Sequence, residues 1–219
     1  SRFGDRSRSA KAPPPTSILL DTVIPLPVNQ KVLILCLSSK SNLTSYFATR
    51  ILIVAVEKLA EALKMHEEVS KGKDAVWAEA SRRLIDAFCQ RIPDMKEIVR
   101  SYKGIPAENI LHKTMASRLL RLYYEIIPQV ALAANFDVSP FFTEVLKSLN
   151  KGSEKHEDES LRVMELENLV SIASYSPGMR WFSRIDNLID GAASSPYTAL
   201  LRLLCDQKRD LPFQQLKKV

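Results

Sequence analysis

The sequence predicts an all-α fold, arranged as an α-solenoid of the HEAT or armadillo kind with roughly eight helices. The centre of the first long apolar segment, residues 51–56, is apolar on every side, and a helix of this kind is buried between neighbours. Glycine is scarce, with 6 in 219 residues, which disfavours the tight turns of an all-β fold. Leu, Ala, Glu, Lys and Arg are abundant and favour helix.

The first half of the chain is predicted to fold into helices that Pro, Gly and Ser residues separate. A short apolar piece at 18–26 is closed by prolines. Residues 28–37 fit a strand or a helix by periodicity, and we interpret them as a helix because a clear helix at 42–68 follows. These two segments form a predicted helical hairpin. The next helix covers 75–92 and stops at Pro93.

The two longer helices carry apolar residues at spacings of three and four, which place them on one face of each helix. In 42–68 these residues are Leu43, Phe47, Ile51, Val54, Ala55, Leu59 and Leu63. In 75–92 they are Trp77, Ala80, Leu84, Phe88 and Ile92. We interpret both stripes as surfaces that pack against neighbouring helices, with Trp77 anchoring the layers.

The second half is predicted to continue the helical pattern without strands. The predicted helices cover residues 94–104, 106–127, 141–149, 161–174, 181–189 and 197–205, with a kinked turn at 129–134. Asp94 and Glu97 have the spacing of a capping box, and Pro106 suits the first turn of the next helix. Ser139-Pro140 and Ser195-Pro196 each read as an N-cap followed by a first-turn proline. The stripe of 161–174 is Leu161, Met164, Leu169 and Ile172.

The chain is expected to divide into a flexible basic arm at 1–16, a helical-repeat domain at 17–207 and a basic tail at 208–219. The domain is expected to be part of a longer solenoid. No exact internal repeat is present, but the helix pairs fit the loose period of roughly 40–47 residues of HEAT and armadillo units. Residues 150–160 are acidic and are expected to form an exposed loop, either an ordered contact or a mobile one.

Charge and cysteine content limit the classes of partner. The net charge is +6 and the pI about 9.2, which permits an acidic partner such as nucleic acid without requiring one. No apolar run approaches the roughly 20 residues of a membrane span, and no signal peptide is visible, so a soluble intracellular protein is expected. Cys36, Cys89 and Cys205 are widely spaced, and they are expected to be buried free thiols of a reducing compartment.

No catalytic, cofactor-binding or metal-binding residue is predicted. His66, His112 and His156 have no partner at a metal-ligand spacing. The sequence also lacks a Gly-rich phosphate loop and a nucleophile elbow. These absences exclude the common enzyme signatures and favour a protein that is not an enzyme.

Basic residues at helical spacings are the candidate binding feature. The residues predicted to contact RNA or a partner are Arg82, Arg83, Lys113, Arg118 and Arg121. Arginine and lysine in such rows can contact phosphates, and Arg118 and Arg121 are expected to share a face. The alternative is that they belong to solvated helix faces. Trp181, near a Pro-Gly break, is expected to anchor packing, with binding of a partner helix as the alternative.

Several stretches resemble the N-terminal domain of the nucleolar pre-ribosomal-associated protein family. They are residues 19–27, 45–59, 77–94, 118–128 and 195–201. The resemblance is clearest at Trp77, Arg83-Leu84, Phe88 and Arg91-Ile92-Pro93-Asp94, and it spans most of residues 18–205. These are packing and turn residues, so the resemblance carries over no catalytic or binding residue.

The resemblance implies a non-catalytic helical scaffold in the nucleolus, in the early assembly of the large ribosomal subunit. It implies contact with pre-ribosomal RNA and with assembly factors that include a DEAD-box RNA helicase, with no membrane and no small-molecule substrate. The alternative from the residues alone is a HEAT- or armadillo-like adaptor that binds proteins and no RNA. Steep weakening of binding by salt distinguishes phosphate contact from an apolar groove.

Overall fold

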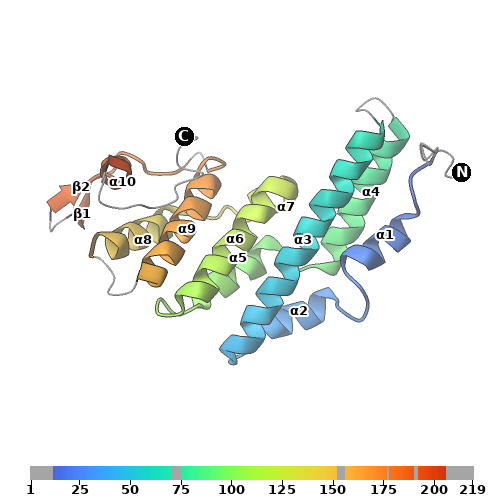
Figure 1. Cartoon of the computed structure of the whole chain (residues 1–219), viewed down its shortest axis with the longest axis horizontal. Helices are drawn as coiled ribbons and strands as arrows, with labels where there is room; N and C mark the ends of the chain where they lie inside the picture. The colour runs from blue at the N-terminus through green and yellow to red at the C-terminus, as the bar shows by residue number, and fades with distance from the viewer. Residues whose placement is uncertain (1–11, 71–74, 152–155, 177, 190–191, 206–219) are drawn as a thin grey trace, which may run out of the picture. The chain divides into compact units, whose positions relative to one another are not determined.

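The computed structural model describes residues 12–70, 75–151, 156–176, 178–189 and 192–205, and within them the chain is mostly helical (Figure 1). The chain forms two compact units, Ser1–Asp94 and Met95–Val219, within the stretch predicted as one helical-repeat domain. The basic tail and residues 1–11 of the basic arm lie outside the described residues. No described helix is both long and apolar enough to cross a membrane.

The first unit contains α1 (Thr16–Val23), α2 (Gln30–Leu37), α3 (Asn42–Ser70) and α4 (Ala75–Arg91). The helix predicted at 28–37 is confirmed as α2, which begins where the Asn29 side chain accepts a hydrogen bond from the Val32 N–H at 3.1 Å. Helices α2 and α3 form the predicted hairpin. Helices α3 and α4 lie side by side, and α1 packs against both (Figure 1).

The buried face of α3 differs from the predicted stripe. Ala55 and Leu59 of that stripe are buried as predicted, beside Leu52 and Val56, whereas four other residues of the stripe are exposed. The exposed residues are Leu43, Phe47, Ile51 and Val54. The prediction was wrong for these residues because a helix that is apolar all round offers several faces at spacings of three and four. Which face α1, α2 and α4 cover is set by tertiary packing.

Helix α4 packs as predicted, with Trp77, Leu84 and Phe88 buried. The end of α4 is also joined to α1 by polar contacts. The Arg91 guanidinium donates to the Asp21 carboxylate at 2.7 Å and to the Ile24 carbonyl at 3.1 Å. Because Arg91 is largely buried, these contacts fix the position of a short helix that could not form alone.

The second unit contains α5 to α10 and one hairpin. Its elements are α5 (Met95–Gly104), α6 (Ile110–Ile126), α7 (Pro128–Leu132), α8 (Ser139–Lys151), α9 (His156–Ala173), β1 (Ile185–Ile189), β2 (Ala192–Ser194) and α10 (Pro196–Cys205). Helix α6 packs against α5 and, most extensively, against α9, which in turn packs against α8 (Figure 1). The core of this unit therefore lies around α6 and α9.

Two predicted helix starts are displaced. Helix α6 begins at Ile110, because residues from Pro106 form a turn closed by the Asn109 N–H on the Pro106 carbonyl at 3.0 Å. Helix α9 begins at His156, inside the predicted acidic loop. Its first turn holds Glu157, Asp158 and Glu159, whose negative charge favours the positive end of the helix dipole. Residues 152–155 of that loop lie outside the described residues.

The predicted helix at 181–189 is wrong, as is the expectation that the chain has no strand. Strands β1 and β2 pair antiparallel, with Ile185 opposite Ser194 and Ile189 opposite Ala192. The sequence signal for this hairpin is the dipeptide Asp190-Gly191 between the two strands. Strand β1 is held to α8 by the Asn150 side chain, which donates to the Leu188 carbonyl at 2.7 Å.

The two predicted serine caps differ in outcome. The Ser195 hydroxyl accepts a hydrogen bond from the Thr198 N–H at 3.1 Å, which confirms it as the N-cap of α10. Ser139 is instead the first residue of α8, and its hydroxyl donates to the Met179 sulfur at 3.3 Å. The Asp137 carboxylate accepts the Ser139 N–H at 3.0 Å and so takes the place expected of a serine cap.

Leu59→Ala tests which face of α3 is buried. We expect this change to lower the free energy of unfolding of the first unit by about 3 kcal/mol, because it leaves a cavity in the core. The matched change Val54→Ala, on the exposed stripe, should alter it by less than about 0.5 kcal/mol. Trp77 fluorescence during urea unfolding, in a Trp181→Phe background, is the measurement. Equal losses for the two variants would contradict this assignment of faces.

Candidate functional site

The predicted basic residues of the first unit are exposed on α4. The Arg82 and Arg83 side chains are 71% and 69% exposed. Both form an ion pair with the one carboxylate of Glu79, at 2.9 and 3.0 Å. One carboxylate offsets one of the two positive charges, and exposed pairs of this kind are weak. Arg82 and Arg83 therefore keep the geometry needed to contact a phosphate.

Lys113 lies inside the second unit, so we remove it from the predicted binding surface. Its side chain is only 10% exposed, and its ammonium lies 3.6 Å from a Glu144 carboxylate oxygen. The same ammonium lies 5.7 Å from the centre of the Tyr102 ring, a distance at which a cation and an aromatic face attract. The positive charge of Lys113 thus interacts with Glu144 and Tyr102 inside the unit.

Arg118 and Arg121 are half-buried on α6. The Arg121 side chain is 20% exposed, and its Nε lies 3.3 Å from the Glu125 carboxylate one turn further on. Helix α6 packs against α5 and α9 on either side of the core, which leaves these guanidinium groups little free surface. They are poorer candidates for phosphate contact than Arg82 and Arg83.

A buried polar cluster next to Lys113 was missed by sequence reasoning. The Tyr102 hydroxyl of α5 donates to the Glu165 carboxylate of α9 at 2.7 Å, and both residues are at most 1% exposed. Burial raises the pKa of Glu165 above its usual value, while the hydrogen bond from Tyr102 and the charge of Lys113 act in the opposite direction. Burial, reinforced by Glu165, also raises the pKa of Tyr102.

Further hydrogen bonds join α6 to α9 beside this cluster. The Asn168 amide donates to the Ser117 hydroxyl at 2.9 Å, and the Thr114 hydroxyl donates to the Leu161 carbonyl at 3.0 Å. Thr114, Ser117 and Asn168 are buried, so their polar groups need these partners. In the predicted stripe of α9, Leu169 and Ile172 are buried as expected, whereas Met164 is 45% exposed and the neighbouring Glu165 is buried.

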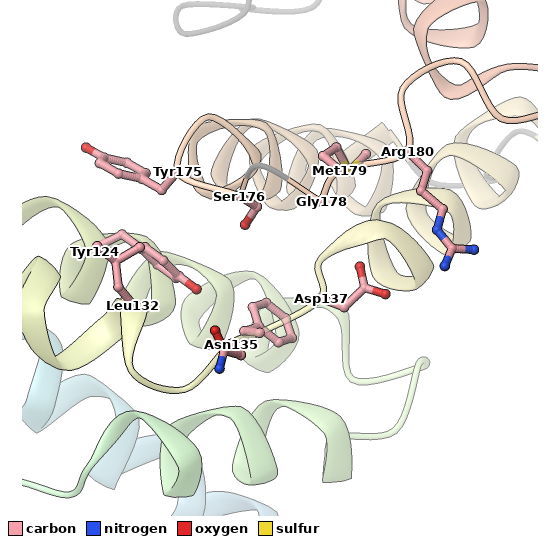
Figure 2. Close-up of a pocket in the computed structure, with 10 residues that line it drawn as sticks. Tyr124, Leu132, Asn135, Asp137, Tyr175, Ser176, Gly178, Met179 and Arg180 are labelled. Atoms are coloured by element: carbon pink, nitrogen blue, oxygen red, sulfur yellow. The ribbon is translucent and has the colours of Figure 1, made fainter.

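A pocket of about 350 Å³ lies in the second unit, where no site was predicted (Figure 2). Asp137 and Arg180 lie toward one end of it and Tyr175 toward the other (Figure 2). The Asp137 carboxylate accepts the Ser139 N–H, and burial raises the pKa of the Tyr124 phenol. The described residues that line the pocket combine aromatic, polar and charged side chains.

The histidines and cysteines are the residue types most often found at metal and thiol centres. Within the part of the chain that the structure describes, no group of His, Cys, Asp or Glu is placed to hold a metal ion. The three cysteines are free: Cys36 and Cys89 are half-buried and Cys205 is exposed, so the predicted burial is wrong for Cys205. Burial, with the nearby Asp86 charge, raises the pKa of Cys89 and so disfavours its reactive thiolate.

His66 is a structural residue of the first unit. It is 4% exposed, its Nδ1 lies 3.0 Å from the Ser81 hydroxyl, and its ring packs edge-on against Trp77. Its Nε2 is buried without a hydrogen-bond partner in the structure. Burial lowers the pKa of His66 below 6.5, so the folded unit holds the neutral ring.

No family model, curated protein or solved structure matches this chain. The class of protein that the described residues define is a mostly helical one. Its function has to be inferred from its own surfaces.

Tyr102→Phe tests the buried cluster. We expect it to lower the free energy of unfolding of the second unit by about 2 kcal/mol, because Glu165 is left inside without its donor. The loss should be larger at about pH 8 than at about pH 5, since the hydroxyl stabilises the ionised carboxylate and its removal raises the pKa of Glu165 further. Urea unfolding followed by Trp181 fluorescence measures both values.

Tyr175→Phe, at a partly exposed tyrosine, is the control for this change. A loss of stability that does not depend on pH would contradict the role given to Glu165.

His66→Gln tests the neutral histidine. A base with a lowered pKa contributes stability that is present above its unfolded pKa, near 6.5, and is lost as the pH falls toward the folded pKa. The wild-type first unit should therefore lose stability between about pH 7 and about pH 5 more steeply than the variant does. Trp77 fluorescence in urea reports this unit. His112→Gln, in the second unit, should leave the Trp77 profile unchanged, and identical profiles for wild type and His66→Gln would refute the assignment.

Proposed function

We propose that this chain is a non-catalytic helical scaffold, part of a HEAT- or armadillo-like solenoid, in the early nucleolar assembly of the large ribosomal subunit. It contacts pre-ribosomal RNA and assembly factors, among them a DEAD-box RNA helicase. The observation that carries the scaffold role is the apolar stripe of α3, which stays exposed while the opposite face of the helix builds the core. An exposed surface of this kind is typical of protein contact.

The ribosomal part of the proposal depends on the resemblance, and two of its stretches meet in the structure. Asp21 belongs to the stretch 19–27 and Arg91 to the stretch 77–94, and these two residues form the 2.7 Å ion pair between α1 and α4. Trp77, Leu84 and Phe88 of the second stretch are core residues. The residues that carry the resemblance thus include a group that jointly holds the first unit together, as expected of packing residues.

RNA contact is supported by Arg82 and Arg83. Each is exposed and close to the same single carboxylate, so a phosphate can replace or join Glu79 as a partner. Guanidinium groups suit phosphate because they donate two parallel hydrogen bonds. Such contacts position the RNA backbone and carry no base specificity.

A protein-binding adaptor without RNA contact is the second candidate. It is favoured by the use of Lys113 inside the second unit and by the half-burial of Arg118 and Arg121. These three residues were predicted to contact RNA or a partner, and their placement removes much of the expected phosphate surface. The exposed stripe of α3 is common to both candidates.

Arg82→Gln combined with Arg83→Gln tests the RNA contact. With a labelled single-stranded RNA in a fluorescence anisotropy titration, we expect about tenfold weaker binding and a shallower dependence on salt, because phosphate contacts release counterions. Lys64→Gln removes an equally exposed cation of the same unit and is the control. Unchanged affinity and salt dependence in the double variant would favour the adaptor.

In-cell UV crosslinking of the tagged protein, with sequencing of the attached RNA, separates the two candidates directly. Enrichment at discrete positions of the large-subunit precursor RNA is expected for the scaffold. Recovery of RNA at background level would leave the protein-binding adaptor.

A further inference from the structure

A groove of about 410 Å³ lies on the first unit between the α1–α2 connection and one side of α3. Its walls are mostly apolar. Helix α3 contributes Phe47, Ile51 and Val54, and the connection contributes Ile24, Pro25 and Val28. The three α3 side chains are 55%, 46% and 44% exposed. We call this surface the α3 groove.

The exposed apolar stripe of α3, which runs into the α3 groove, has the length and spacing of a helix-binding surface. Leu43, Phe47, Ile51 and Val54 are all exposed and follow one another at intervals of three and four residues, so they lie along one side of α3. From Leu43 to Val54 the stripe extends for roughly 17 Å, or three helical turns. An amphipathic helix that packs along it would cover the stripe with its own residues at the same spacing.

The charges at the groove are of one sign. Arg50 and Lys58 line it, and no carboxylate is among the described residues that do. Both lie on the groove side of α3, with Arg50 between Phe47 and Ile51 and Lys58 one turn beyond Val54. The Lys58 ammonium donates to the Thr22 carbonyl, a neutral acceptor, at 3.4 Å. A partner with carboxylates next to its apolar residues is therefore favoured over a basic or purely apolar one.

We propose that the α3 groove binds an amphipathic α-helix of a partner protein, in which apolar residues at helical spacing are flanked by Asp or Glu. The apolar residues cover Phe47, Ile51 and Val54. The acidic residues meet Arg50, which lies beside the stripe, and Lys58, which lies one turn beyond Val54. The groove thus selects its partner by shape along the stripe and by charge next to it.

Other occupants fit the charge of the groove less well. The parts of this chain outside the described residues at its two ends are basic, with four Lys or Arg against one Asp in residues 1–11 and four against two in residues 206–219. A second copy presenting the same face would bring the same two cations and no carboxylate. Like charges brought together in this way oppose association.

The inference deepens the protein-contact part of the proposed scaffold role and does not depend on RNA. It holds equally for the adaptor. Loss of RNA binding in the crosslinking experiment therefore leaves it standing, and failure of the groove leaves the RNA contact untouched.

The test uses the whole chain and a labelled helical peptide of about 18 residues, a length at which a helix is stable enough to study. The peptide carries Leu at the spacing of the stripe and Glu beside it. Two comparison peptides carry Lys in place of Glu, or the same residues in scrambled order. Anisotropy gives the affinity, and amide chemical shifts locate the contact.

We expect the Glu peptide to bind at least about tenfold more tightly than either comparison peptide, with shift changes at Phe47, Ile51 and Val54. Ile51→Asp should weaken binding about tenfold, as should Arg50→Glu combined with Lys58→Glu. Met65→Asp and Lys64→Glu change equally exposed residues of α3 outside the groove, and they should have little effect.

Four outcomes would overturn the proposal, the last of them with RNA. The first is equal affinity for the Glu and Lys peptides, or no binding at about millimolar peptide. The second is shift changes that fall outside the groove, or equal losses in the groove variants and their controls. The third is a dimer in analytical ultracentrifugation that Ile51→Asp dissociates, which would assign the groove to a second copy. A labelled RNA whose binding is lost on Arg50→Glu with Lys58→Glu, while the peptide does not bind, would assign the cations to RNA.

Discussion

Short helices are marginal in water, and each unit of this protein depends on a central helix or helix pair against which the shorter ones pack. In the first unit that helix is α3, with 29 residues, and α1 and α2 have only 8 each. In the second the centre is the pair of α6 and α9, with α5 and α7 packed on α6 and α8 packed on α9. Burial of apolar side chains between these helices supplies most of the favourable free energy, at about 25 cal/mol per Å² of apolar surface. The helix faces that this packing leaves uncovered are the ones available to partners.

The second unit adds a polar constraint to this apolar one. A carboxylate at 1% exposure is costly unless it is hydrogen-bonded and paired, and Glu165 has the Tyr102 hydroxyl and the nearby Lys113 charge. Because those groups come from α5, α6 and α9, the three helices can satisfy them in few relative positions. The hydrogen bond and the nearby positive charge offset part of the free-energy cost of burying Glu165, and they also restrict how the three helices pack. The same contacts explain why Lys113, which was predicted on the binding surface, lies inside the unit.

The sequence predicted what depends on local backbone chemistry. Pro93 ends α4 and Ser195 caps α10, because each acts on its own neighbours in the chain. What depends on tertiary contacts was not predictable: the face of α3 that is buried, the position of Lys113, and the pocket built from segments between Tyr124 and Arg180. The hairpin is an intermediate case. Its Asp190-Gly191 signal was present, but the flanking residues alternate too weakly to exclude a helix.

The distribution of charge bears on which partners the helices serve. The net charge of +6 permits nucleic acid as a partner, yet residues 1–11 and 206–219 together carry five of those six charges. The stretch between them, which holds every described helix, is nearly neutral. Under the proposed function, long-range attraction of RNA would therefore come mainly from the two ends of the sequence, with Arg82 and Arg83 as a local addition. A nearly neutral body whose longest helix keeps an exposed apolar stripe is better suited to holding protein helices, and a scaffold that joins RNA to protein needs both kinds of surface.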